Sequence, residues 1–228
     1  MPFFALASLS GAEVELLQDL PDPHHHASQQ DLYAADVLPS SRLIVAGWAC
    51  RYRLLADRRR QILGFMLPGD FVGRVLLPDL PLPYAVVALT ELTTISVQPL
   101  AETAANPDST ALARAVRLTA HLDDLLLLNQ LTRLGQQTAR ERVVHLVLEL
   151  HERLGWMGLT RGDQFAMPLT SDVLADALGL SVVHVNRTLQ QLRTEGLMEV
   201  EGSMVALLKL ERLQDVVKWT PLSAALEH

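Results

Sequence analysis

The feature that most constrains this 228-residue chain is the stretch from Leu174 to Leu192, LADALGLSVVHVNRTLQQL, in which two helical patterns meet. Thr170 is a good N-cap for the first helix, and Gly179 can adopt the left-handed conformation that ends it. One residue later, Ser181 is a second good N-cap. This spacing predicts a helix-turn-helix over residues 170–193, with two helices crossing at a steep angle.

The second of these helices has two faces of different chemistry. Val185, Leu189 and Leu192 repeat at i, i+4 and i+7, so we expect them to face the core. No Asp or Glu occurs between Asp176 and Glu195, although the chain has a net charge of −7. A helix that enters the major groove of DNA must not direct carboxylates towards phosphates. The candidate DNA-contacting residues are Thr170, Ser181, Val182, Val183, His184, Asn186, Arg187 and Gln190.

These candidates differ in what they can contact. Arg187 can donate two hydrogen bonds to O6 and N7 of guanine. Asn186 and Gln190 carry both donors and acceptors for adenine or phosphate, whereas Val182 and Val183 can make only apolar contacts, such as one with a thymine methyl group. By spacing alone, an ordinary helical hairpin in an all-α domain is the alternative interpretation.

The segments that flank the helix pair favour DNA binding over that alternative. GLMEVEGSMVALLKL reads as two short strands joined by a turn at residues 201–203, and FAMPL, before the first helix, is a candidate third strand. The order helix, helix, hairpin is typical of a winged helix, and we expect this domain to span residues 137–222. Glu199 and Glu201 make its hairpin a poor electrostatic partner for DNA.

Upstream, the pattern is that of a small β domain. Between Arg42 and Val97 the extended runs RLIVAGWA, RYRLL, QILGFML, YAVVAL and TTISV alternate with turns rich in Pro and Gly. Many short strands in about 60 residues predict a small antiparallel barrel or sandwich. The preceding PDPHHHASQQ is expected to form a loop.

A long helical pattern of about residues 108–135 follows the strands, and we expect the strands and this helix to form one N-terminal domain, residues 1–136. Its apolar residues occupy most of the helix circumference, and such a helix must be covered on more than one side. We expect one side to pair with a second copy of the chain, although a helix buried wholly within one chain is the alternative. The candidate dimer-interface residues are Leu118, Leu122, Leu125, Leu126 and Asn129, the last of which could fix the register.

The next helix is predicted from TARERVVHLVLELHERLG. Thr138 and Glu141 have the spacing of a capping box, and Gly155 can end the helix. His145 and His151 are six residues apart and do not share a helix face at the spacing of metal ligands. We interpret both as surface or packing histidines.

Composition excludes several classes of site. Cys50 is the only cysteine, which excludes an internal disulfide, a zinc ribbon and a cluster held by four thiolates. Its place in an alternating strand pattern indicates a packed thiol, with a redox sensor as the alternative. No apolar run reaches the roughly 18 residues that a membrane span needs, and no secretion signal is recognisable. We therefore expect a cytoplasmic protein without membrane contact.

Three consecutive histidines, His24 to His26, are the one hint of a metal-dependent enzyme. The sequence contains no His-Glu-x-x-His, phosphate loop, nucleophile elbow or Gly-x-Gly-x-x-Gly motif. We therefore expect no catalysis, no cofactor and no bound metal.

The order of these features resembles the Crp/Fnr family of bacterial transcription regulators over nearly the whole chain. LTSDVLADALGLSVVHVNRTLQQLRTEGLMEV is similar to the helix-turn-helix and the start of the wing, and DRRRQILGFMLPGDFVG is similar to the effector domain. The resemblance implies an α+β fold with an N-terminal cyclic-nucleotide-binding-like antiparallel β-barrel, a long dimerisation helix and a C-terminal winged helix-turn-helix. It also implies a homodimer that binds palindromic promoter DNA under control of a signal at the barrel, with RNA polymerase as a further partner.

The resemblance also implies roles for single residues. Arg187 matches an arginine that members commonly place on a base, Ser181 matches the cap of the recognition helix, and His184 falls where members often touch phosphate. Val182 and Val183 stand where some members have a polar, base-reading pair, so the target sequence cannot be transferred from them.

The effector site departs further from the family pattern. Cyclic-nucleotide binders follow the last Gly of the GDFVG turn with a Glu for the ribose and place an Arg downstream for the phosphate. Here Arg74 follows Gly73, and LPDLPLPYAVVAL contains no arginine. A buried phosphate without a cation is costly, so we expect an unknown small-molecule effector rather than cyclic AMP. The candidate pocket residues are Gly69, Asp70, Gly73, Arg74 and Tyr84.

The cysteine cluster of the oxygen-sensing branch is absent as well. The acidic second half and the two valines leave one alternative function open. It is a dimeric ligand-binding sensor that acts through a protein partner without binding DNA.

Overall fold

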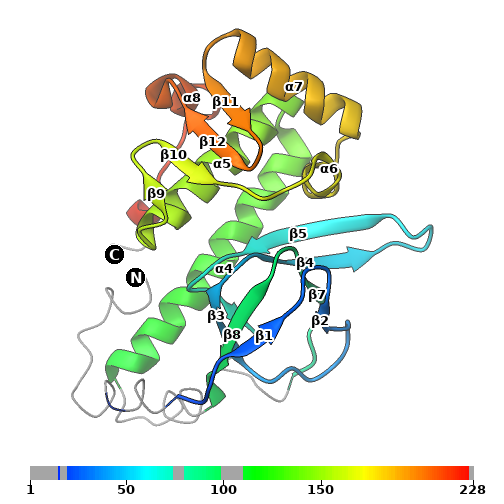
Figure 1. Cartoon of the computed structure of the whole chain (residues 1–228), viewed down its shortest axis with the longest axis vertical. Coiled ribbons are helices and arrows are strands. Elements are labelled where there is room, and N and C mark those ends of the chain that lie inside the picture. The colour runs from blue at the N-terminus through cyan, green and yellow to red at the C-terminus, as the bar shows by residue number, and fades with distance from the viewer. Residues whose placement is uncertain (1–14, 16–19, 74–79, 99–109, 226–228) are drawn as a thin grey trace. The chain divides into compact units, whose positions relative to one another are not determined.

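The computed structural model describes residues 15, 20–73, 80–98 and 110–225 (Figure 1). These residues divide by internal packing into two compact units. The first comprises the described residues of Met1–Arg53 and Phe65–Asp124, and the second those of Leu54–Gly64 and Leu125–His228. This division falls inside a long helix, whereas the sequence predicted a domain boundary after residue 136.

The first unit is built on antiparallel β structure, as the sequence predicted. One four-stranded sheet has the order β1 (His24–His26), β8 (Leu92–Ser96), β3 (Arg42–Ala46) and β6 (Phe71–Val72). The other has the order β2 (Asp31–Tyr33), β7 (Ala85–Ala88), β4 (Ala49–Leu54) and β5 (Arg60–Met66), and the outer part of its β4–β5 hairpin, residues 54–64, packs with the second unit.

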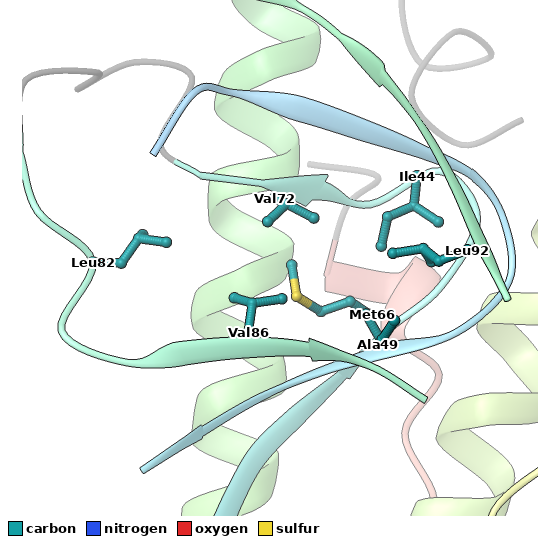
Figure 2. Close-up of a cluster of buried hydrophobic side chains, with 8 residues drawn as sticks. Ile44, Ala49, Met66, Val72, Leu82, Val86 and Leu92 are labelled. Carbon is teal, nitrogen blue, oxygen red and sulfur yellow. The ribbon is translucent and has the colours of Figure 1, made fainter. Parts of the chain in front are cut away.

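Apolar side chains from both sheets form the core of this unit (Figure 2). In β8 the buried Leu92 and Thr94 alternate with the more exposed Thr93 and Ile95, because successive side chains point to opposite faces of a sheet. Leu32, Tyr33 and Tyr84 pack against the cluster and are only partly buried. Its fully buried members are Ile44, Ala49, Met66, Val72, Leu82, Val86, Ala88 and Leu92.

The prediction that the histidine tract forms a loop is wrong, since it forms strand β1. This strand pairs with β8 in the register His24–Thr94 and His26–Leu92. The side chains add hydrogen bonds to this pairing: His25 Nδ1 lies 3.1 Å from Thr93 Oγ1, and His26 Nε2 lies 2.9 Å from Thr94 Oγ1. Pairing with a strand almost 70 residues away, rather than local propensity, decides the structure here.

Two long helices follow, α4 (Thr110–Gln136) and α5 (Ala139–Trp156). The capping box at the start of α5 is confirmed, because the Thr138 hydroxyl accepts from the Glu141 amide and the Glu141 carboxylate accepts from the Thr138 amide. The helix extends one residue past Gly155, which was the predicted end.

The second unit contains the predicted helix pair and a small sheet. The helices are α6 (Ser171–Leu178) and α7 (Val182–Thr194). The sheet has the order β11 (Met198–Glu201), β12 (Met204–Leu207), β10 (Gln164–Ala166) and β9 (Thr160–Arg161), and the candidate strand FAMPL contributes to β10. Helix α8 (Leu210–Val217) and the 3-10 helix η1 (Leu222–Ala225) complete the unit. Within the described residues, no helix is long and apolar enough to cross a membrane.

A buried polar cluster joins α4 to α5 inside the second unit. Arg133 Nη2 lies 2.7 Å from Glu149 Oε2, and both side chains are almost completely buried. His145, also on α5, is 9% exposed and lies 2.9 Å from the amide of Gln137 through Nδ1. Burial and the positive charge of Arg133 lower the pKa of His145 to about 4, although Glu149 acts in the opposite direction. This histidine is therefore neutral in the folded chain at pH 7.

Candidate DNA-binding site

The turn between α6 and α7 depends on glycine at position 179. Gly179 has φ 61° and ψ 38°, the left-handed conformation that β-carbon-bearing residues adopt at a cost. A Cβ atom at this position would also lie 3.1 Å from Leu134 Cδ2 and 3.5 Å from Arg142 Nη1. The backbone angle therefore favours glycine, the packing around it is tight, and the predicted break is confirmed.

Both helices of the pair begin at the predicted caps. The Thr170 hydroxyl accepts a hydrogen bond from the Val173 amide, and the Ser181 hydroxyl accepts one from the His184 amide. A hydroxyl that accepts a bond can still donate its own hydrogen. Thr170 and Ser181 can therefore cap their helices and donate to a phosphate oxygen at the same time.

The inner stripe of α7 differs in one residue from the prediction. Val185 and Leu192 are fully buried as expected, but Leu189 is only half-buried. Thr188 is buried in its place, and its hydroxyl donates to the carbonyl oxygen of His184 at 2.8 Å. Sequence reasoning missed Thr188 because its hydroxyl gives it the pattern of a surface residue, whereas its bond within the helix allows burial.

The outer face of α7 displays the remaining candidates to solvent. Val183 is 74% exposed, an unusual amount for a large apolar side chain, and it stands beside hydrogen-bonding groups. Val182 is half-buried at the start of the helix. The other exposed candidates on this helix and its cap are Ser181, His184, Asn186, Arg187 and Gln190.

Asn186 is held by the preceding helix. Its Oδ1 atom accepts a hydrogen bond from the Ser171 hydroxyl at 2.6 Å. The acceptor of this amide is therefore engaged, which leaves its two N–H donors for a phosphate or base oxygen. No signal in the sequence indicated this bond, because the two residues lie on different helices.

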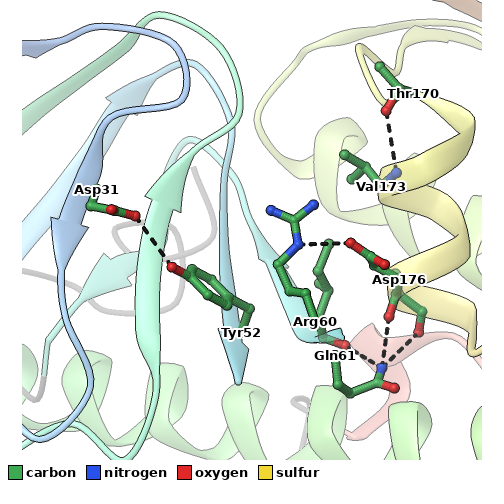
Figure 3. A network of polar contacts seen from close by, with 9 residues as sticks. Asp31, Tyr52, Arg60, Gln61, Thr170, Val173 and Asp176 are labelled. Carbon is green, nitrogen blue, oxygen red and sulfur yellow. Dashed lines mark hydrogen bonds and ion pairs between the residues drawn. The ribbon is translucent and has the colours of Figure 1, made fainter. Parts of the chain in front are cut away.

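The carboxylates that flank the site are paired with arginines. Arg140 Nη1 lies 2.6 Å from Glu195 Oε1 at the end of α7, and Arg60 Nε lies 2.8 Å from Asp176 Oδ2 on α6 (Figure 3). Pairs this exposed contribute little to stability. They do reduce the negative charge on both sides of α7, which favours the approach of DNA.

The candidate effector residues of the first unit have structural tasks. Asp70 Oδ2 accepts from the Leu67 amide at 2.7 Å, which closes the turn between β5 and β6. Gly69 in this turn and Gly73, directly after β6, both have a positive φ angle of 95°. Tyr84 lies at the edge of the core, and Arg74 lies outside the described residues.

Sequence reasoning missed Arg51, a cation on β4 whose side chain is mostly covered. Its Nη1 atom lies 3.1 Å from Asp123 Oδ1 on α4, and its guanidinium carbon lies 5.9 Å from the centre of the Tyr84 ring. Burial by itself would lower the pKa of Arg51, but Asp123 and Tyr84 together raise it above its ordinary value. The alternating run RYRLL predicted a strand, but it did not indicate which face of the sheet Arg51 would occupy.

Helix α4 leaves part of its surface uncovered in the single chain. Of the candidate interface residues, Leu118, Leu122, Leu125 and Asn129 are half-buried, whereas Leu126 is buried by its own chain. More exposed are three leucines that were not among the candidates: Leu127, Leu128 and Leu131. The most open apolar surface of α4 thus lies towards its C-terminal end.

The structure gives no support to a metal site. Within residues 20–73, 80–98 and 110–225, no group of three or more His, Cys, Asp or Glu side chains is arranged to hold a metal ion. The rings of His24 and His26 contact each other edge to face, and His25 and His26 instead form hydrogen bonds with Thr93 and Thr94.

Comparisons with known proteins agree with this architecture. Residues 141–216 match the Crp-like helix-turn-helix domain, and residues 32–102 match the cyclic nucleotide-binding domain. The chain is 29% identical over 184 residues to the transcriptional activator protein FnrL of Cereibacter sphaeroides, which covers 78% of this chain and 72% of that protein. It is 27% identical over 210 residues to the nitrogen fixation regulation protein FixK of Bradyrhizobium diazoefficiens, which covers 91% of this chain and 87% of that protein.

A solved structure extends the similarity to three dimensions. FixK2 from Bradyrhizobium japonicum matches with a TM-score of 0.74 and 27% identity over 86% of this chain and 96% of that chain. The α+β architecture is the same, with a β domain, a long helix and a helix-turn-helix domain carrying a small sheet. These proteins are regulators rather than enzymes. The chain is thus a DNA-binding transcription regulator of the Crp/Fnr type.

Proposed function

We propose that this regulator binds a palindromic promoter site as a homodimer, under the control of a signal received by its N-terminal β domain. The observation that carries the proposal is the outer face of α7. Arg187 is exposed there, and no carboxylate of the described residues pairs with it. Its guanidinium is therefore free to contact a guanine, as the polar neighbours His184 and Gln190 are free to contact phosphates or bases.

The dimer is supported by the uncovered surface of α4. Leu127, Leu128 and Leu131 are 52%, 59% and 68% exposed in the single chain. Neighbouring exposed leucines on one helix are typical of an interaction surface. A twin helix packed on this surface would bury them together with the half-buried Leu125, which lies three residues before Leu128 on the same side of α4. Two-fold symmetry would then place the recognition helices about 34 Å apart, one turn of DNA.

We infer that the effector is not a cyclic nucleotide. The core of the β domain is filled mainly by aliphatic side chains, and Gly69 and Asp70 form the turn between β5 and β6. Arg51, whose side chain is 12% exposed, already pairs with Asp123. A buried cyclic phosphate would need a cation of its own.

We also infer that the protein belongs to a branch without an iron–sulfur cluster. Cys50 is the only cysteine of the chain, and it is completely buried in β4. Four thiolates would be needed for a cluster of the usual kind. Action in the cytoplasm, with RNA polymerase as a partner, completes the proposal.

The test is genome-wide mapping of the DNA bound by the protein, followed by gel shifts on the mapped fragments at low and moderate salt. We expect retarded complexes on sites with two symmetric half-sites, and weaker complexes for Arg187→Ala. Complete absence of protein–DNA complexes would overturn the proposal and favour a sensor that acts through a protein partner.

A further inference from the structure

The C-terminal end of α6 is tied to three other elements by side chains. The last carbonyl groups of any helix lack partners within that helix. Here Gln61 Nε2 donates to the carbonyl oxygen of Asp176 at 3.0 Å, as Figure 3 shows. Gln130 Nε2 donates to that of Ala177 at 2.6 Å, and Arg142 Nη1 to that of Leu178 at 2.9 Å. Three consecutive carbonyl groups are thus held from outside the helix.

The two glutamines lie on elements that both units share. Gln61 belongs to β5, in the outer part of the β4–β5 hairpin, and Gln130 belongs to the C-terminal part of α4. Both the hairpin and α4 have their remaining residues in the first unit. The hairpin and α4 therefore each run continuously from the β domain to the residues that bind the end of α6.

Both polar atoms of the Gln130 side chain form hydrogen bonds that hold it in place. The residue is 5% exposed, and Nε2 also donates to the carbonyl oxygen of Ile62 on β5 at 3.2 Å. Its Oε1 atom accepts from Arg133, which is in turn paired with Glu149. One amide thus joins the hairpin, α4 and α6. Hydrogen bonds in such a buried network reinforce one another and allow little freedom of rotation.

We propose that Gln61 and Gln130 are positioning residues for DNA recognition, an inference that rests on the proposed DNA-binding function. Only Gly179 and Leu180 separate the end of α6 from the cap of α7. The orientation of α6 at its last turn therefore sets the direction in which α7 starts. Loss of either amide would remove its bonds to α6 and release the recognition helix from this orientation.

The test uses the full-length protein and the variants Gln130→Met and Gln61→Met, which keep side-chain length and remove the amide. Gln136→Met, at an exposed position of α4, is the matched control. Hydrogen exchange of the amides in residues 178–184 measures the freedom of the turn. Each lost bond is worth about 0.5–1.5 kcal/mol, so we expect exchange there to rise roughly two- to tenfold in the two variants and to stay unchanged in the control.

DNA affinity is the second readout, measured on a mapped site and on random DNA of equal length. We expect the affinity of both variants for the mapped site to fall roughly tenfold while their affinity for random DNA stays unchanged. Because Gln61 Nε2 also lies 3.4 Å from the Ala177 oxygen that Gln130 binds, the effects in the double variant should not be additive.

Different outcomes separate the two proposals. Unchanged exchange at 178–184, or a rise of equal size in the wing residues 198–207, would show that the glutamines do not position the turn. If Gln130→Met does not fold, Gln61→Met, at a half-buried position, decides alone. If the wild-type protein binds no DNA but exchange at residues 178–184 still rises in the two variants, the glutamines position the turn and the proposed DNA-binding function is wrong.

Discussion

His145 predicts how the stability of the second unit depends on pH. The ring is 9% exposed, accepts or donates one hydrogen bond with Gln137, and contacts Trp219 edge to face. Its pKa is about 4 in the folded chain, against an ordinary value of 6.5. The unfolded chain therefore takes up a proton at a higher pH than the folded chain does. Its contribution to stability is complete above pH 6.5 and is lost as the pH falls towards 4.

The magnitude follows from the two pKa values. Proton linkage at a single site gives a loss of about 2 kcal/mol in the free energy of unfolding between pH 7 and pH 5. The measurement is urea denaturation of wild type and His145→Gln at both pH values and at one protein concentration. Glutamine can keep a hydrogen bond to Gln137 but cannot be protonated, so the variant should lose about 2 kcal/mol less than wild type.

His184→Gln, on the exposed face of α7, is the control and should lose as much as wild type. Carboxylates that titrate in the same range affect all three proteins equally, and the difference between them isolates His145. An equal loss in His145→Gln and wild type would show that the buried ring is not responsible, and would refute the reasoning.

Three further substitutions test other parts of the structure. Glu149→Gln should lower the free energy of unfolding by about 3–5 kcal/mol, because the buried Arg133 loses its counter-charge, and the double variant Arg133→Met/Glu149→Leu should recover most of it in the same urea titration. Gly179→Ala should cost about 1–3 kcal/mol by thermal denaturation, since alanine is strained at positive φ. Leu131→Glu should yield monomers in light scattering, whereas Leu55→Glu, at another exposed leucine, should leave a dimer. For each of the three substitutions, behaviour equal to that of wild type would contradict the structural role given to the replaced residue.

Local chemistry explains why the helix-turn-helix could be predicted closely. The caps Thr170 and Ser181 and the left-handed Gly179 act within a few residues of their own positions. The capping box of α5 is equally local. Such signals are readable in the sequence because the interacting groups are sequence neighbours.

Features that depend on distant residues could not be predicted in this way. Strand β1 exists because the histidine tract pairs with β8, and Arg51 has an ion-pair partner because α4 brings Asp123 to it. The bond between Ser171 and Asn186 crosses from one helix to another. In each case the partner is defined only by the fold, and the residue type alone would favour a loop, a surface position or a free side chain.

The binding of wild type and Arg187→Ala to one mapped palindrome and to random DNA of equal length, at one salt concentration, tests the central claim most directly. The account predicts two chains of wild type per palindrome. It also predicts that the substitution costs about 1–3 kcal/mol on the palindrome and much less on random DNA. Equal binding of wild type to both DNAs, or equal losses on both, would contradict the claim that the outer face of α7 reads the sequence.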